Sequence, residues 1–487
     1  MKFTSFTDEA KIALGGLADY ASDIVNPTIR LGVTGLARSG KTIFITALVH
    51  NLIHGGRLPL LEPYAAGRIK RAYLQPQPDD DVPRFAYEDH IDTLTAGAQR
   101  TWPHSTRRIS QLRLTVEYEP DGFFARSFAG GTLNIDIVDY PGEWLLDLPL
   151  LDLSYAEWCQ KTLEIAHKAP RQALAKDWVE FISALNPLNP EDEAKARQAA
   201  QKFTSYLHAC REDDYALSTV APGRFLMPGD LDGSPLITFA PLLLPEDQSS
   251  APSGSIWAMM ERRYESYVTR VVKPFFMNHF ARIDRQIVLV DTLAALNAGP
   301  NAIEDLQAAL GDILQCFRPG KTSWLNAILG RKVDHVLFAA TKADHLHQSS
   351  HDQFEAIMAR IVDEALTRTQ STGAAFDVLA LASIRATREA TLQQNGDELP
   401  SIIGTPESGE TLGNDTFDGL TEAALFPGDL PDNAEDALAG AMENDSVKFL
   451  RFRPPLLDDP SSPGAEPSFP HIRIDRALQF LMGDRFS

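Results

Sequence analysis

Residues 35–42 read Gly35-Leu36-Ala37-Arg38-Ser39-Gly40-Lys41-Thr42 and fit the phosphate-binding pattern G-x-x-x-x-G-K-[ST]. A short apolar run at residues 29–34 precedes the pattern and predicts a strand, and residues 43–52 follow it with the apolar spacing of a helix. A glycine-rich loop between a strand and a helix can bind phosphate, because its backbone N–H groups converge on the phosphate oxygens and the helix dipole adds positive potential. The stretch therefore predicts an α/β nucleotide-binding domain.

Two residues of this loop carry the predicted phosphate chemistry. Lys41 would reach the β- and γ-phosphates of a bound nucleotide, and the Thr42 hydroxyl would bind magnesium. The rest of the loop would surround the phosphates with backbone N–H groups, and we assign this binding role to Gly35, Arg38, Ser39 and Gly40.

The composition and charge of the chain argue against a nucleic-acid-binding protein, a disulfide-rich protein and a membrane-spanning protein. The chain has 487 residues, enough for two or three domains, and a formal net charge of −21. Nucleic acid repels so acidic a surface on average, and we expect no nucleic-acid partner. The three cysteines are too few and too widely spaced for a disulfide framework. No stretch approaches the roughly twenty apolar residues of a membrane-spanning helix. We expect a cytoplasmic protein without an integral membrane segment.

Strand and helix patterns divide the chain into four parts. Residues 1–28 predict an N-terminal helix that docks on the protein or lies on a membrane surface. Strands alternate with helices in residues 29–144 and 283–390, which predicts one discontinuous core with a mainly parallel sheet and one antiparallel edge strand. Residues 145–282 predict a large, mostly helical insertion. Residues 391–487 predict an acidic loop with one short strand at residues 401–404, then a C-terminal strand at residues 448–452 and a helix at residues 472–482 that pack on the core.

A second motif ends an apolar strand at Ile135-Asp136-Ile137-Val138-Asp139-Tyr140-Pro141-Gly142 and matches the D-x-x-G of regulatory GTPases. Asp139 would hold magnesium, usually through a water, and the Gly142 N–H would contact the γ-phosphate and sense its presence. Many such enzymes follow this glycine with a glutamine that orients the attacking water, but here the residue is Glu143. A carboxylate is disfavoured beside an anionic phosphate chain. We therefore expect slow intrinsic hydrolysis unless a partner or an arginine compensates.

A third motif, Thr341-Lys342-Ala343-Asp344, follows the apolar run at residues 336–340 and resembles the guanine-reading pattern [NT]-K-x-D. The Asp344 carboxylate could accept hydrogen bonds from both N1–H and the 2-amino group of guanine, a donor pair that adenine lacks. The Lys342 stem would pack along the base and loop. After the last core strand, Ser383 and Ile384 could present backbone N–H groups to the guanine O6.

The first switch carries a weaker signal. Its magnesium-binding threonine should lie between the loop helix and the strand that begins near residue 109, and we choose Thr106 for this catalytic and metal-binding role. Thr101 and Ser105 are the alternatives. The neighbouring Arg107 or Arg108 could act as an internal arginine finger, although a solvated surface charge is the more ordinary interpretation.

The order of these motifs resembles that of Ras-like GTPases. The long helical insertion after D-x-x-G, residues 284–291, and the phrase Phe338-Ala339-Ala340-Thr341-Lys342-Ala343-Asp344-His345 resemble the bacterial YcjX family of P-loop GTPases. The likeness spans nearly the whole chain. It implies a Ras-like P-loop core with a helical domain, a role in stress response and an unknown protein partner, with a membrane protein as one candidate. Such a partner would place the chain at the periphery of the inner membrane.

Taken together, the motifs predict a magnesium-dependent protein that binds GTP and GDP, hydrolyses GTP slowly and switches between two nucleotide states. Two alternatives stay open. An ATP-dependent phosphotransferase on the same loop would make Asp344 incidental and would need a second substrate pocket in the insertion. A non-hydrolysing, nucleotide-gated scaffold would use the insertion and the acidic loop as partner-binding surfaces, and Glu143 favours this version.

Overall fold

The computed structural model describes residues 27–36, 38–104, 108–121, 131–212, 215–316, 333–367, 374–394, 397–440, 449–456 and 468–486. Residues 1–26, which hold most of the predicted N-terminal helix, lie outside the described residues. Throughout the described ranges, no helix combines the length and the apolar character needed to cross a membrane.

Within these ranges, seven strands form the central sheet in the order β2-β3-β4-β1-β5-β6-β7. The strands are Thr28–Gly35 (β1), Ile69–Gln75 (β2), Ser110–Tyr118 (β3), Gly131–Asp139 (β4), Arg285–Val290 (β5), His335–Ala340 (β6) and Ala375–Ala380 (β7). Neighbours from β4 to β7 pair in parallel, whereas β3 pairs antiparallel with both β4 and β2. The predicted α/β class with a mainly parallel sheet is confirmed. β2 is an addition that the sequence did not predict, and it lies outside β3 at the edge.

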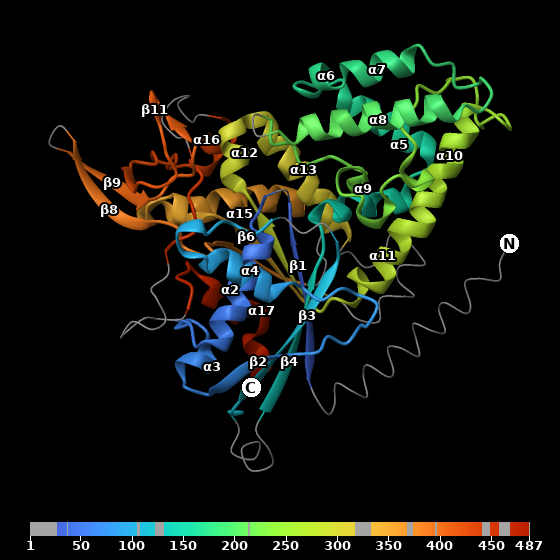
Figure 1. The fold of residues 1–487 in the computed structure, drawn as a ribbon. Helices are drawn as coiled ribbons and strands as arrows, with labels where there is room; N and C mark the ends of the chain where they lie inside the picture. The colour runs from blue at the N-terminus through green and yellow to red at the C-terminus, as the bar shows by residue number, and fades with distance from the viewer. Residues whose placement is uncertain are drawn as a thin grey trace.

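Each face of the sheet carries its own buried layer, because successive side chains of a strand point to opposite faces. In β5, Ile287 and Leu289 join one cluster, while Val288 and Val290 join the other. Helices from both ends of the chain cover the first face: α2 (Lys41–Ile53), α3 (Glu62–Ala65), α4 (Tyr87–Thr95) and α17 (Ile474–Met482). The second face packs against α12 (Thr292–Ala298), α13 (Pro300–Cys316) and α15 (His351–Thr367). Figure 1 shows these helices around the sheet.

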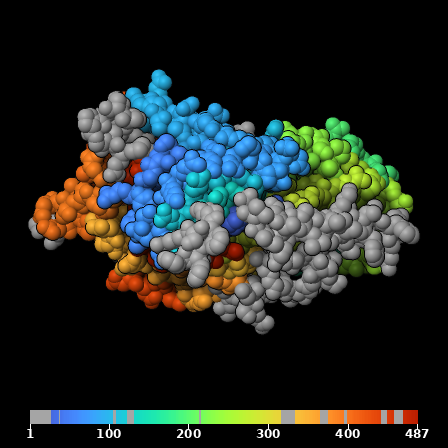
Figure 2. Space-filling view, turned by 90° about the horizontal axis from the view of Figure 1, so that it is seen from below, coloured from blue at the N-terminus to red at the C-terminus, as the bar shows by residue number. Residues whose placement is uncertain are grey.

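A helical region separates β4 from β5 in the sequence. It begins with a 3₁₀ segment, η3 (Gly142–Asp152), and continues through α5 (Tyr155–Ala166), α6 (Arg171–Leu174), α7 (Lys176–Ser183), α8 (Glu193–Cys210), α9 (Gly223–Leu226), α10 (Ile256–Tyr267) and α11 (Lys273–Asn278). Aromatic rings fill its interior. Trp158 stacks on Tyr264 with ring centroids 5.1 Å apart, and Trp178 stacks on Tyr206 at 5.5 Å. In Figure 2 this green region and the orange C-terminal part lie at opposite ends, with the blue N-terminal part between them.

The acidic segment after the core differs from its prediction. The sequence indicated a long solvated loop with one short strand at residues 401–404, and that strand is present as part of β9 (Asp397–Gly404). In place of the loop, β8 (Arg388–Gln394), β9 and β12 (Ala423–Leu425) form an antiparallel sheet, accompanied by β10 (Thr411–Leu412), β11 (Asp415–Thr416) and α16 (Ala434–Leu438). The loop prediction was wrong here because the segment has a small core of its own: Ile402 packs against Leu450 and Phe452. Its acidic charges lie outside, as in the ion pair between Arg388 and Glu422 at 2.7 Å.

Of the two elements predicted at the C-terminus, the helix is present and the strand is largely absent from the described residues. The strand predicted at residues 448–452 is reduced, within the described part, to a single bridge between Pro406 and Phe452. The helix is present as α17, whose apolar residues Ile474, Ala477 and Leu478 belong to the buried layer of the first sheet face.

Candidate nucleotide-binding site

The predicted phosphate loop connects β1 to α2 at the carboxyl end of the parallel strands. Gly40 has a left-handed backbone (φ 77°) directly before α2, a conformation that a side chain would strain. Gly35 is crowded for a different reason, because a Cβ there would lie 1.9 Å from Ser39 Oγ and 3.1 Å from the Cβ of Leu289. The local geometry therefore favours glycine at both ends of the loop.

A cavity of about 550 Å³ lies over this loop. Residues of the first two motifs form part of its wall: Gly35, Arg38, Ser39, Gly40, Lys41, Thr42, Gly142 and Glu143. The predicted base-reading residues form another part: Thr341, Lys342, Asp344, Ser383 and Ile384. These segments are distant in the sequence, but each follows the carboxyl end of β1, β4, β6 or β7, the edge where open α/β sheets bind ligands.

The glycine of the second motif packs directly on the phosphate loop. A Cβ on Gly142 would lie 1.9 Å from the carbonyl oxygen of Gly35, so only glycine allows this backbone-to-backbone contact. Gly142 also begins η3, which leads into the helical region. A displacement of Gly142 would consequently move the start of that region.

Oxygen groups suited to magnesium lie at the phosphate end of the cavity. The Asp139 carboxylate is buried at the end of β4 and forms an ion pair with the Lys41 ammonium. Ser110 Oγ, which lies opposite Asp139 in the β3–β4 register, donates to Asp139 Oδ2 at 3.4 Å. The Thr42 hydroxyl belongs to a buried residue at the start of α2. Carboxylate and hydroxyl oxygens are the ligands that magnesium prefers, so these residues fit the ion.

The candidate guanine-reading carboxylate belongs to a buried residue of the cavity wall, and Asp344 is 4% exposed. Burial raises the pKa of Asp344 to about 6, and the hydrogen bond that its Oδ2 accepts from the Ala386 N–H at 2.8 Å works in the opposite direction. The Thr387 hydroxyl donates to the carbonyl oxygen of Asp344. Both partners come from the segment after β7, so this segment fixes the orientation of the carboxylate.

Lys342 has an unusual backbone conformation and a partly buried acidic partner. Its φ of 63° lies in the left-handed region, which a non-glycine residue rarely adopts and which is often found at functional sites. Its ammonium group pairs with the carboxylate of Asp291, the residue after β5. Asp291 also caps α12 by accepting a hydrogen bond from the Ala294 N–H at 3.2 Å. The Lys342 side chain is thereby held toward the neighbouring strand end.

Glu143 is bound by an arginine of the helical region. The Arg211 Nη2 lies 2.7 Å from Glu143 Oε1, and both residues line the cavity. No local sequence pattern indicates this pair, because Arg211 follows α8 and nothing near it marks a nucleotide site.

The cavity wall also contains residues that the motifs did not identify. Trp102 and Pro103 precede β3, and Glu407, Arg451 and Phe452 belong to the C-terminal part. The aromatic character of Trp102 and Phe452 could have drawn attention to them, since rings often lie against nucleotide bases. Their positions in the sequence gave no such indication.

None of the described candidates for the first switch lines the cavity, and the others lie outside the described residues. Thr106, Ser105 and Arg107 lie outside the described residues. Thr101 is exposed and does not line the cavity. Arg108 is 66% exposed, pairs with Asp230 at 3.5 Å and is also absent from the cavity wall, which agrees with the favoured interpretation as a surface charge and not with the arginine-finger alternative. Its charge is solvated at the surface.

Comparison with known proteins identifies relatives along most of the chain. A model described as the YcjX-like family, DUF463, matches residues 29–486. One relative is the Ras-like GTPase YcjX of Escherichia coli (strain K12), 36% identical over 472 residues that cover 95% of this chain and 96% of that protein. Another is the Ras-like GTPase YcjX of Shewanella oneidensis (strain MR-1), 34% identical over 477 residues that cover 94% of each chain.

Proposed function

The chain belongs to the YcjX-like family, and from this premise we propose that it is a magnesium-dependent, GTP-binding switch protein that hydrolyses GTP slowly. The observation that carries the proposal is the shared cavity. Phosphate-loop residues and Asp344 line the same space, so one nucleotide could contact Lys41 with its phosphates and Asp344 with its base. A protein that used only the phosphate loop would not need a carboxylate at the base position.

The phosphate end supplies the groups for hydrolysis. Lys41 would leave its ion pair with Asp139 and bind the β- and γ-phosphates, and Asp139 would turn from the ammonium to magnesium, together with Thr42. Bound magnesium would neutralise charge on the β- and γ-phosphates. The Gly142 N–H would stabilise the γ-phosphate oxygens through a hydrogen bond that strengthens as charge spreads over them.

The switch would act through η3. Gly142 touches the phosphate loop, and the residues after it contact the helical region at several points. Asp147 accepts a hydrogen bond from the Gly223 N–H at 2.6 Å and another from the Tyr267 hydroxyl. The Arg224 guanidinium lies 3.1 Å from the centre of the Trp144 ring. A change at Gly142 would therefore reach α9 and α10, and we propose that the helical region reports the nucleotide state to a partner.

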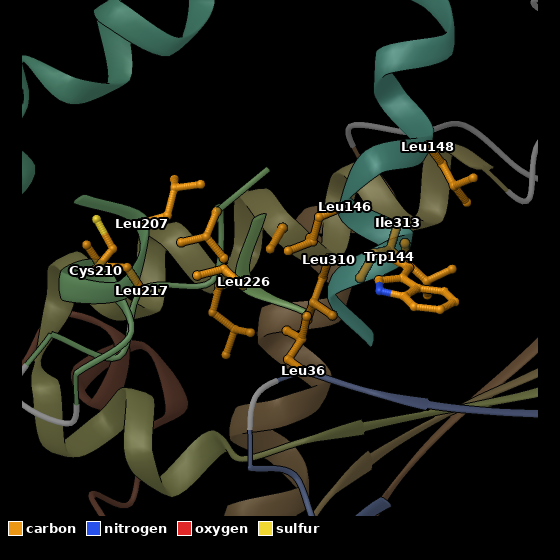
Figure 3. Packing of buried hydrophobic residues seen from close by; sticks show 14 of the residues in the cluster. Leu36, Trp144, Leu146, Leu148, Leu207, Cys210, Leu217, Leu226, Leu310 and Ile313 are labelled. Atoms are coloured by element: carbon orange, nitrogen blue, oxygen red, sulfur yellow. The ribbon is translucent and has the colours of Figure 1, made fainter. Parts of the chain in front are cut away.

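Packing supports the same route. Leu36 of the phosphate loop belongs to one buried cluster with Trp144, Leu226 and Leu310, as Figure 3 shows. Close-packed side chains transmit displacements because they cannot deform independently. A stress-related role and a membrane-protein partner at the inner membrane are proposed from the family resemblance alone.

A non-hydrolysing scaffold is the second candidate, and the identity of residue 143 favours it. Glu143 stands where many GTPases have the glutamine that orients the attacking water. Single-turnover assays separate the two, since a scaffold would hold GTP intact over hours and a slow GTPase would release phosphate.

The test of the proposed function is competition against fluorescent GDP by GTP, ATP and XTP. We expect GTP to compete far better than ATP in the wild type, and Asp344→Asn to shift the preference toward XTP. Asp377→Asn is the matched control, because Asp377 is half-exposed on β7 and pairs with Arg476 at 3.8 Å. Equal competition by ATP would contradict guanine recognition and would support a phosphotransferase.

A further inference from the structure

We propose that Arg211, supplied by the helical region of the same chain, is the catalytic arginine of GTP hydrolysis and that Glu143 holds it beside the γ-phosphate position. This assignment deepens the proposed function and rests on it. In the structure, the Arg211 Nη2 lies 2.7 Å from Glu143 Oε1. The two side chains are 16% and 8% exposed, so the pair is largely removed from solvent.

The location of the pair points to the phosphates. Glu143 directly follows Gly142, whose backbone touches Gly35, and Arg211 lines the cavity together with Lys41. The Arg211 guanidinium is therefore bound to the residue next to the proposed γ-phosphate sensor. The base-reading residues belong to the segments after β6 and β7.

Both backbones are fixed by packing. Arg211 is the C-cap of α8, and the chain after it is tied back by a hydrogen bond from the Leu217 N–H to the Cys210 carbonyl at 2.9 Å. On the other side, a Cβ at Gly223 would lie 2.0 Å from the Glu143 carbonyl oxygen. An exchange of one anionic partner for another would therefore involve the long Arg211 side chain and not a shift of either backbone.

The other cations of the cavity wall have different assignments. Lys41 pairs with Asp139, Lys342 with Asp291, and Arg451 with Glu410 at 2.8 Å. Arg38 lies within the phosphate loop itself. Among the described cavity residues, Arg211 is the cation that the helical region brings to the D-x-x-G side.

The chemistry requires such a group. In hydrolysis the water oxygen forms a bond to the γ-phosphorus, and the bond from phosphorus to the β–γ bridging oxygen breaks. The bridging oxygen keeps the electron pair and leaves with GDP, and the water proton passes to the inorganic phosphate. Arg211 forms no covalent bond. Its planar fork would leave the Glu143 carboxylate and donate hydrogen bonds to the oxygens on which charge develops.

This exchange also explains a glutamate at position 143. Alone beside the phosphates, a carboxylate would raise the energy of bound GTP by repulsion. Paired with Arg211 it is neutralised, and it keeps the guanidinium near its place of action before the nucleotide arrives. Glu143 is in this view a positioning residue and Arg211 a catalytic one.

The experiment compares wild type, Arg211→Ala, Arg211→Lys and Arg197→Ala. Arg197 lies on the same helix α8 and pairs with Glu193 at 3.5 Å on the surface, so it controls for loss of a charge there. We measure single-turnover GTP hydrolysis, affinity for fluorescent GDP, and capture of GDP with aluminium fluoride, which mimics the transferred phosphoryl group.

For Arg211→Ala we expect hydrolysis to fall about a thousandfold and aluminium fluoride capture to be lost, with GDP affinity within about threefold of wild type. Arg211→Lys should recover little of the rate, because an ammonium cannot replace the bidentate fork. Added guanidinium ion should partly restore Arg211→Ala. Arg197→Ala should match wild type in all three measurements.

Two results would overturn the assignment. One is wild-type hydrolysis and aluminium fluoride capture by Arg211→Ala. The other is a loss of GDP affinity as large as the loss of rate in both Arg211→Ala and Arg211→Lys, which would make Arg211 structural. A wild-type protein that neither binds GDP nor hydrolyses GTP would instead overturn the proposed function itself, so the two failures are distinguishable.

Discussion

The indole Nε1 of Trp102 donates a hydrogen bond of 2.6 Å to the carbonyl oxygen of Phe452, and both residues line the nucleotide cavity. The contact joins the segment before β3 to the C-terminal part of the chain. It is reinforced by Arg100 Nε, which donates to the Pro454 carbonyl at 2.6 Å, and by Arg453 Nη2, which donates to the Ala98 carbonyl at 2.7 Å. The C-terminal part is thus a component of the cavity wall.

From this contact we predict that Trp102→Ala speeds the release of GDP about tenfold, because it removes a large aromatic surface and the hydrogen bond that holds Phe452 in place. Stopped-flow release of fluorescent GDP measures the rate. Trp102→Phe should give an intermediate rate, since it keeps a ring but loses the donor. Unchanged release in both variants would show that this side of the wall does not contact the nucleotide.

The buried pair of Lys41 and Asp139 gives a prediction for stability as well as binding. Lys41→Ala should weaken GDP binding by about a hundredfold through lost phosphate contacts. It should also lower the free energy of unfolding of the nucleotide-free protein by about 3 kcal/mol, because it leaves a buried carboxylate without its cation. Denaturant unfolding measures the second effect. Adding Asp139→Asn should restore part of that stability without restoring GDP affinity, and a double variant as unstable as Lys41→Ala would contradict the explanation.

The raised pKa of Asp344 predicts a pH-dependent affinity for guanine nucleotides. Its pKa is about 6 because the carboxyl is buried, and only the ionised form accepts both guanine donors. The dissociation constant for GDP should therefore be flat above pH 7 and rise about tenfold for each unit below pH 6. Burial lowers the pKa of His345 to about 3, so that ring stays neutral over this range.

The measurement is a GDP titration from pH 5 to pH 8 in wild type and Asp344→Asn. Protonation of the GDP phosphates affects both proteins equally, so the difference between the two curves isolates Asp344. The same pH dependence in the variant would assign the effect to another group.

A second buried carboxyl, Asp147, predicts how stability changes with pH. Burial raises its pKa to about 6 in the folded protein, above the ordinary value of 3.8. The folded state binds this proton more tightly than the unfolded state, so the stabilisation is complete below pH 4 and is lost as pH rises through 6. The loss is on the order of 3 kcal/mol. Unfolding free energies at pH 4, 5, 6 and 7 should fall less steeply in Asp147→Asn than in wild type. Equal slopes would mean that Asp147 is not protonated in the folded state.

The sequence predicted the parts of the site in which nucleotide binding requires particular residues at a fixed spacing. Short apolar runs ending in glycine, aspartate or threonine marked β1, β4 and β6, and the residues after them line one cavity because parallel strands end at a common edge. The repeated return of such runs after a long helical stretch was enough to predict a discontinuous core.

The missed features depend on contacts between distant segments. Arg211 meets Glu143, and Trp102 meets Phe452, only after the helical region and the C-terminal part have packed against the core. No spacing rule connects these positions. Only residues 401–404, the second half of β9, were predicted as a strand in the acidic segment. β8 and the first half of β9 were missed because acidic residues dominate them, and the apolar residues that fold the segment, such as Ile402, pack against the distant Leu450 and Phe452.

The sheet topology has a consequence for synthesis of the protein on the ribosome. β1 is the central strand, flanked by β4 on one side and by β5 on the other, and the whole helical region is translated between those two neighbours. At about 5–20 residues per second, the roughly 150 intervening residues take roughly 7–30 s to emerge. During that time the β5 side of β1 has no partner strand, and an open edge of this kind can pair with other chains. A nascent chain of this family would accordingly benefit from a chaperone that covers this edge over that interval.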